Sequence, residues 1–142
     1  QLHGLDISDE MLSVARKRMG AGCVLSRGDA TDFDAATLFG RPTFDRVFIS
    51  YALSMIPQWE LAIEQAAGAL SPGGSLHVVD FGDFAGLPTF ARRLMHRWLA
   101  KFHVSPREEM GLVAARIAQD HGLTVRTLRG RFGYYRRITL RK

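Results

Sequence analysis

The sequence predicts one α/β domain, a three-layer sandwich in which helices cover a mostly parallel sheet. Two observations predict it. Short apolar runs alternate with helical patterns along residues 1–82, and the 142 residues are 46% hydrophobic and 23% charged, as in an ordinary globular domain. No linker of low complexity and no internal repeat divides the chain. We therefore treat residues 1–142 as a single domain.

The first part of the chain has the pattern strand, helix, strand. Leu2 to Ile7 is short and apolar, and Ser8 is placed to cap the helix that follows. This helix has acidic residues in its first turn and basic residues in its last, and Gly20 ends it. Cys23 to Ser26 can form a second strand, and a loop follows it.

The middle of the chain continues the alternation. Phe44 to Ser50 is a strand with apolar residues on both faces, which predicts helices on both sides of it. Pro57 opens a helix whose apolar residues recur at helical spacing. Residues 71–74 form the turn that leads into a strand from Ser75 to Asp80.

The last third of the chain is basic and breaks the alternation. Residues 90–102 form a basic amphipathic helix. Ser105, Pro106 and Glu108 are typical of a capping box that opens a further helix. Residues 123–128 and 134–140 predict an antiparallel hairpin at the edge of the sheet.

Composition narrows the function classes. The longest apolar run is about half the roughly 20 residues of a membrane span, and one cysteine, Cys23, cannot form an internal disulfide, so we expect a cytoplasmic protein. The histidines show no metal-ligand spacing, so no metal site is predicted. Residues 91–142 hold 13 basic and 3 acidic residues. This charge suits an anionic membrane, an acidic substrate or nucleic acid, although no nucleic-acid motif is present.

Polar residues follow three predicted strands, at the carboxyl edge where open α/β sheets bind ligands. Asp6 ends the first strand, Asp29 follows the second, and Ser50 and Tyr51 end the third. In a Rossmann-like nucleotide-binding unit, an acidic residue at such a position accepts hydrogen bonds from both ribose hydroxyls. Because Ser8 already caps the helix, Asp6 is predicted to bind a ribose. Asp29 is predicted either to meet an adenine amino group or to stabilise its own turn.

Four segments resemble the successive motifs of class I S-adenosylmethionine-dependent methyltransferases: residues 5–12, 28–30, 44–47 and 70–74. The resemblance covers residues 1 to about 83. Residues 50–59, 76–82 and 101–106 are further similar to the N-methyltransferase of betaine-lipid synthesis, which methylates the amine of diacylglyceryl homoserine. The resemblance therefore implies a Rossmann-like fold, S-adenosylmethionine as cofactor and a lipid amine as methyl acceptor.

The resemblance also implies roles for the residues at the carboxyl edge. Asp6 would bind the ribose, Ile7 and Met11 would contact the adenine, and Asp29 with Ala30 would hold the edge of the adenine ring.

Ser50 and Tyr51 would lie beside the transferred methyl group. Tyr51 is the residue we expect to orient the amine. An amine with a pKa near 8 loses its proton at a cost of only about 1 kcal/mol at neutral pH, so no strong base is required.

Further substrate contacts are expected from aromatic and histidine side chains outside the motifs: Trp59, Trp98, Tyr134, Tyr135 and His103. The four aromatic rings can attract the growing ammonium by cation–π contact, and each can instead belong to the core. His103 can relay a proton or contact a lipid carboxylate, and it can equally be a surface histidine.

The chain departs from the family pattern at its start. The first strand and its glycine-rich loop are absent, because the acidic residue that should follow that loop by about 20 residues stands at position 6. We expect an N-terminally truncated domain in which two neighbouring strands have unpaired edges. The 142-residue chain alone is then expected to bind S-adenosylmethionine weakly or not at all.

Several alternatives stay open at this level. The acceptor can be a quinone-like or other small molecule, the chain can be a non-catalytic remnant, or Arg129, Arg131, Arg136 and Arg137 can contact nucleic-acid phosphates. The basic helix over residues 90–102 can lie on an anionic bilayer at the membrane periphery or pack as a lid on the sheet.

Overall fold

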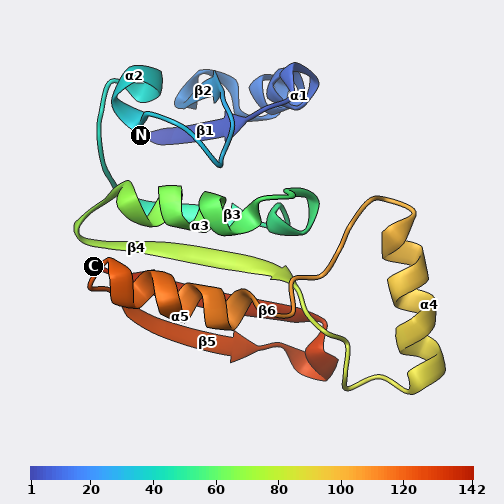
Figure 1. Cartoon of the computed structure of the whole chain (residues 1–142). Coiled ribbons are helices and arrows are strands. Elements are labelled where there is room, and N and C mark those ends of the chain that lie inside the picture. The colour runs from blue at the N-terminus through green and yellow to red at the C-terminus, as the bar shows by residue number, and fades with distance from the viewer.

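The computed structural model describes residues 1–142 and has the predicted α/β architecture (Figure 1). The strands are β1 (Leu2–Asp6), β2 (Cys23–Arg27), β3 (Phe44–Ser50), β4 (Leu70–Phe81), β5 (Thr124–Arg129) and β6 (Tyr135–Arg141). The helices are α1 (Asp9–Met19), α2 (Ala35–Phe39), α3 (Trp59–Gly68), α4 (Thr89–Ala100) and α5 (Met110–Asp120).

The strands form two separate sheets. One contains β1 and β2 as a parallel pair, and the other has four strands in the order β3-β4-β6-β5. In the larger sheet β3 and β4 are parallel, whereas β6 is antiparallel to both β4 and β5. The predicted antiparallel hairpin of β5 and β6 is confirmed, and β5 is the strand at the edge of the sheet.

No strand lies between β1 and β3, which confirms the expected pair of unpaired edges. At their amino ends the two strands are linked by aromatic rings. The His3 ring of β1 lies 5.2 Å from the Phe44 ring of β3, and the Phe39 ring lies 5.3 Å from His3 and 5.7 Å from Phe44. The two sheets therefore contact each other near the start of β3 without a shared ladder of hydrogen bonds.

The core lies between the four-stranded sheet and helices α3 and α5, which cover one of its faces (Figure 1). Its 16 buried residues all lie between residues 53 and 140, among them Ile63, Leu76 and Ile138. The prediction that both faces of β3 are covered is wrong: Phe48, on the face opposite α3, is 69% exposed. No helix lies on that face to bury its ring.

The turn predicted at residues 71–74 is a bulge inside the long strand β4. Phe44 pairs with Leu70, whereas Arg46 pairs with Ser75, so the intervening residues of β4 loop out. Gly73 has a positive φ of 75°, and a Cβ on Gly74 would lie 2.8 Å from the Ser71 carbonyl oxygen. Both positions therefore require glycine.

The helices of the structure differ in part from the predicted ones. The helix expected from Pro57 begins at Trp59, and the short helix α2, capped by Asp34, was not predicted. The predicted capping box does not open α5, which begins at Met110. The Ser105 N–H donates instead to the Ser54 carbonyl, which holds this segment against the loop after β3.

Candidate active site

Asp6 lies at the carboxyl end of β1, where the sequence predicts a ribose-binding carboxylate. Its Oδ1 accepts a hydrogen bond from the Ser8 N–H at 2.8 Å, and the Ser8 hydroxyl accepts from the Met11 N–H at 3.3 Å. Ser8 therefore caps α1 as predicted, and Asp6 fixes the backbone before the cap. The second carboxylate oxygen, Oδ2, has no protein partner and is free to accept from a ligand.

The predicted adenine contacts lie around this carboxylate. Ile7 and Met11 are exposed apolar side chains next to Asp6, and they offer a surface for a flat ring. Ala30 packs against the core of the larger sheet. Asp29 accepts from the backbone N–H and the hydroxyl of Thr31, and these two hydrogen bonds lower the pKa of its carboxyl. Asp29 thus stabilises its own turn through one oxygen.

Tyr51 follows Ser50 directly at the carboxyl end of β3 and has a left-handed backbone, with φ 50°. Its N–H donates to the Val79 carbonyl at 2.8 Å, which ties the turn to β4. Burial raises the pKa of the Tyr51 phenol, and the nearby Tyr134 and Asp80 raise it further. The phenol is therefore protonated at neutral pH, so it can donate a hydrogen bond but cannot act as a base.

The Tyr51 ring belongs to a group of four rings that we call the aromatic cluster, made up of Tyr51, Phe81, Phe84 and Tyr134. Phe81 lies 4.9 Å from Tyr51, 6.5 Å from Phe84 and 6.1 Å from Tyr134, and the Phe84 and Tyr134 rings are 5.7 Å apart. Phe84 is fully buried, whereas the Tyr134 ring is half exposed. The cluster forms an aromatic wall beside the end of β3.

Two loops hold this wall in place. The N–H groups of Phe84 and Gly86 donate to the carbonyls of Gly133 and Phe132. The loops approach so closely that a Cβ on Gly82 would overlap the Gly133 carbonyl oxygen. The Asp83 carboxylate binds Arg129 at 2.7 Å, which closes the contact with an ion pair. Of the four rings of this wall, Tyr51 and Tyr134 were predicted from the sequence, whereas Phe81 and Phe84 were not, because their contacts with Tyr51 and Tyr134 join residues 30 to 53 positions apart.

A second set of contacts that the sequence analysis missed fixes the loop after Tyr51. Asp80, fully buried at the end of β4, accepts from the Ser54 N–H at 3.1 Å and from the Phe81 N–H at 2.7 Å. Arg107 donates to the carbonyls of Leu53 and Ile56 at 3.2 and 2.7 Å. Residues 53–56 are thereby held from both sides.

The other predicted substrate residues are dispersed. Trp59 is buried in the core, so its prediction as a substrate contact is wrong: the apolar side of α3 that carries it faces the sheet. Tyr135 lies opposite Phe81 in the register of β4 and β6 and close enough to Tyr51 to influence its pKa. Trp98 and His103 lie on α4 and on the turn after it, and neither ring contacts the aromatic cluster.

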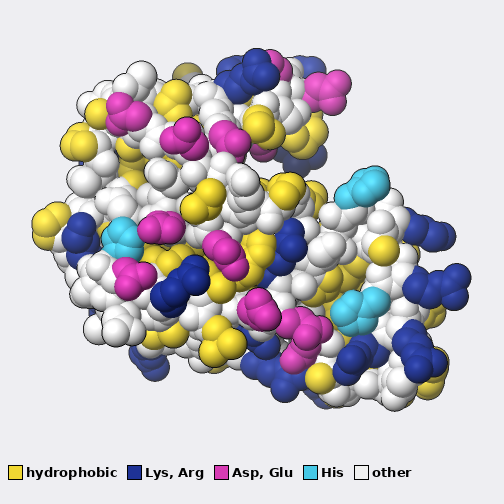
Figure 2. Space-filling view, in the orientation of Figure 1, with side chains coloured by type: hydrophobic (Ala, Val, Ile, Leu, Met, Phe, Trp, Pro, Cys, Tyr) yellow, Lys and Arg dark blue, Asp and Glu magenta, His cyan; other side chains and the backbone are white.

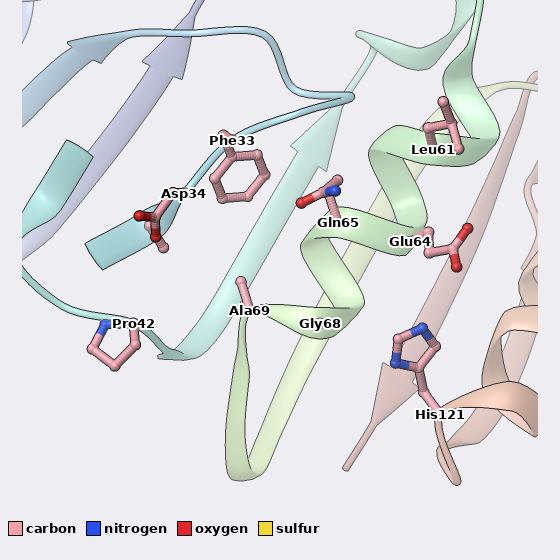
Figure 3. A pocket seen from close by; sticks show the side chains of 10 residues that line it. Phe33, Asp34, Pro42, Leu61, Glu64, Gln65, Gly68, Ala69 and His121 are labelled. Carbon is pink, nitrogen blue, oxygen red and sulfur yellow. The ribbon is translucent and has the colours of Figure 1, made fainter. Parts of the chain in front are cut away.

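A cavity of about 590 Å³ forms a groove between α2 and α3 (Figure 3). Pro42 and Ala69 lie two residues and one residue before β3 and β4 and belong to its lining, so it reaches the amino ends of these strands. Figure 3 shows Asp34 and Pro42 on one side and Gln65 and Glu64 of α3 on the other. The groove contains none of the predicted cofactor residues and is not the candidate active site.

A family profile described as a methyltransferase domain matches residues 1–74. The ubiquinone/menaquinone biosynthesis C-methyltransferase UbiE of Roseobacter denitrificans is 32% identical over 126 residues, which are 88% of this chain and 48% of that protein. The chain thus spans about half the length of this curated relative.

Solved structures share the fold at low sequence identity. An S-adenosylmethionine-dependent methyltransferase from Mesorhizobium loti has a TM-score of 0.70 and 18% identity over 99% of this chain and 80% of its own. The N-methyltransferase NodS from Bradyrhizobium japonicum, solved with S-adenosyl-L-homocysteine, has a TM-score of 0.66 and 19% identity over 100% of this chain and 66% of its own. The chain belongs to the methyltransferase domain family, and its fold is that of these two solved methyltransferases.

Proposed function

We propose that the complete protein transfers methyl groups from S-adenosylmethionine to the amine of a lipid headgroup of the diacylglyceryl homoserine type. The observation that carries this proposal is the aromatic cluster at the carboxyl edge, with the protonated Tyr51 phenol among its rings. Aromatic faces attract a nearby cation by about 0.5–2 kcal/mol. An amine acquires positive charge as it is methylated, so such a wall favours the charge that develops during transfer.

The residues of the carboxyl edge then have separate tasks. The cofactor supplies a methyl group made electrophilic by its sulfonium. Asp6 holds the ribose hydroxyls through its free oxygen, and Ile7 with Met11 covers the adenine. Tyr51 positions the neutral amine in line with the methyl group. Such alignment contributes up to about 7–11 kcal/mol to catalysis, and the proton of the amine is lost to water.

A quinone-like acceptor is the second candidate, and the name of the curated relative favours it. The rings of the aromatic cluster can also stack against a flat quinol. Both candidates are hydrophobic molecules carried in a membrane, so we infer that the enzyme meets its acceptor at a membrane surface.

Methyl-labelled S-adenosylmethionine distinguishes the acceptors. We expect the complete protein to label diacylglyceryl homoserine with one, two and three methyl groups, as resolved by mass spectrometry, and to leave a demethylated quinol unlabelled. The reverse result supports the quinone-like acceptor, and no label on either acceptor overturns both candidates.

Variants of Tyr51 test the aromatic cluster directly. Tyr51→Ala should lower kcat/KM by about tenfold because the ring is lost, whereas Tyr51→Phe should keep most of the attraction for the cation. Phe48→Ala, which removes an exposed ring on the uncovered face of the same strand, is the matched control and should leave kcat/KM unchanged. An equal loss in Tyr51→Phe and Tyr51→Ala would assign the effect to the hydroxyl alone.

A further inference from the structure

Helix α4 exposes a row of large apolar side chains that we call the apolar ridge: Phe90, Leu94 and Trp98, continued by Phe102 after the helix ends. The three helical residues are four positions apart, which places them on one side of the helix. Their side chains are 76%, 68% and 53% exposed. The Trp98 and Phe102 rings meet edge to face at 5.0 Å, so the ridge is continuous.

The ridge is not the side by which α4 packs on the domain. Leu99, which is 1% exposed, and His96, whose ring lies 5.6 Å from Phe84, make that contact. On a helical wheel Leu99 points about 100° away from Trp98 and farther still from Phe90. Figure 1 shows α4 beyond the carboxyl end of β4, at the end of the sheet that carries the candidate active site. The lid interpretation therefore accounts for Leu99 and leaves the ridge unexplained.

Basic side chains run beside the ridge. Arg93, Arg97 and Lys101, here called the basic row, are also spaced four positions apart, on the flank of the helix next to Phe90 and Leu94. Residues 84–106 contain no Asp or Glu, and none of the three cations makes an ion pair. Figure 2 shows Lys and Arg side chains gathered along the outer margin of the lobe that α4 forms.

We propose that α4 docks the protein on an anionic phospholipid bilayer. The apolar ridge enters the boundary between headgroups and acyl chains, and the basic row meets the lipid phosphates, as expected for a helix lying in the plane of the interface. None of the helices combines the length and apolar character needed to cross a bilayer. This inference rests on the proposed function, because docking through α4 brings the carboxyl edge close to a lipid acceptor.

Vesicle binding by the whole chain tests the docking. The probes are vesicles of phosphatidylcholine alone and vesicles of phosphatidylcholine mixed equally with phosphatidylglycerol. We expect sedimentation with the mixed vesicles only, weakened by high salt. Tryptophan emission should shift to shorter wavelength on binding, and the shift reports Trp98 because the other tryptophan, Trp59, is already buried.

Paired variants distinguish binding through the apolar ridge and the basic row from non-specific binding to vesicles. Leu94→Ser should weaken binding about tenfold, and Arg97→Gln about fivefold, in line with the usual values for a buried leucine and for a cation at an anionic surface. The matched controls lie on α5: Leu112→Ser, where Leu112 is 76% exposed, and Arg116→Gln. Both controls should bind as the unaltered chain does.

Three results would overturn the docking: no sedimentation with the mixed vesicles, equal binding to neutral vesicles, or equal losses in the α5 controls. Sedimentation without a shift in tryptophan emission would also overturn it, because another surface would then make the contact. The vesicles contain no methyl acceptor, so these results are independent of the proposed reaction. Failure to methylate either acceptor in detergent micelles would instead overturn the proposed function and leave the docking intact.

Discussion

The regions around the two sheets differ in how many buried core residues they contain. The N-terminal region, residues 1–41, carries Asp6, Ile7, Met11, Asp29 and Ala30, the predicted cofactor contacts, but buries only Leu12 and Ala35 among its apolar residues. The C-terminal region, residues 44–142, contains the whole 16-residue core cluster. A region can thus carry the recognisable motifs of a family while most of the packing free energy lies elsewhere.

The largest expected effect comes from a cavity in the C-terminal core. Leu76→Ala should lower the free energy of unfolding by about 2–5 kcal/mol, because Leu76 is fully buried under α3 and α5. Urea denaturation measures this loss.

Leu12→Ala is the counterpart in the N-terminal region. It should speed amide hydrogen exchange in residues 1–41 and leave the protection of β4 unchanged. Equal loss of protection in β4 would show that the two regions unfold as one unit, and the comparison would then fail.

The next effect concerns the buried carboxylate at the end of β4. Asp80→Asn replaces one of the two accepting oxygens by an amide nitrogen, which cannot accept a hydrogen bond. One of the N–H groups of Ser54 and Phe81 then loses its acceptor, and the protein should be destabilised by about 1–3 kcal/mol. Thermal unfolding gives the loss, and faster exchange of the Ser54 amide locates it. Asp45→Asn, where an exposed carboxylate accepts from the Ser71 hydroxyl, is the control and should change stability little.

A smaller effect is expected where the two regions meet. Phe44→Ala removes the ring that contacts His3 and Phe39 and should cost about 1–2 kcal/mol, seen mainly as faster amide exchange in β1 and β2. Phe48→Ala, on the same strand but exposed, should leave this exchange unchanged. If both variants behave alike, the aromatic contact does not couple the regions.

The smallest expected effect is the pH dependence that His77 gives to the free energy of unfolding. Burial lowers the pKa of His77, and the neighbouring Arg46, Arg137 and Arg141 lower it further. Below about pH 6.5 the unfolded chain therefore binds a proton at His77 more readily than the folded chain does. The contribution of His77 to the free energy of unfolding is then fully present above that pH and is lost as the pH falls below it. One proton changes stability by at most about 1.4 kcal/mol per pH unit.

His77→Gln should flatten this dependence in urea titrations between pH 7 and pH 5. The pKa of His3 is also lowered, by burial and by Arg41, but His3→Gln should alter only the amide exchange of the N-terminal region. A flat pH profile in the unaltered chain would contradict the prediction.

Most of the secondary structure could be predicted from local sequence patterns. Ser8 and Gly20 fix both ends of α1, and the apolar runs gave five of the six strands within about two residues, because capping and alternation depend on near neighbours. The sixth, β4, was predicted only from Ser75, since the bulge before it obscures its start at Leu70.

The candidate site was predictable only where it follows strand ends. Asp6 and Tyr51 lie at such ends, whereas Asp80 meets Ser54 and Arg107 meets Leu53 across 26 and 54 positions, which no local pattern reveals. The role of Trp59 was predicted wrongly, because helical spacing identifies the apolar side of a helix but does not show whether that side faces the core or a ligand. Phe48 was predicted to be covered by a helix for a similar reason: an apolar side chain on a strand does not show that its face of the sheet is covered.

The conformation of Tyr51 has a consequence for anyone who redesigns this protein. A non-glycine residue with a left-handed backbone is strained by about 1–3 kcal/mol, so Tyr51→Gly should relieve the strain of the turn after β3 while it deletes the phenol and its packing on Phe81. A redesign that ranks substitutions by backbone strain alone would select glycine here, and its product would lack the side chain on which the proposed reaction depends.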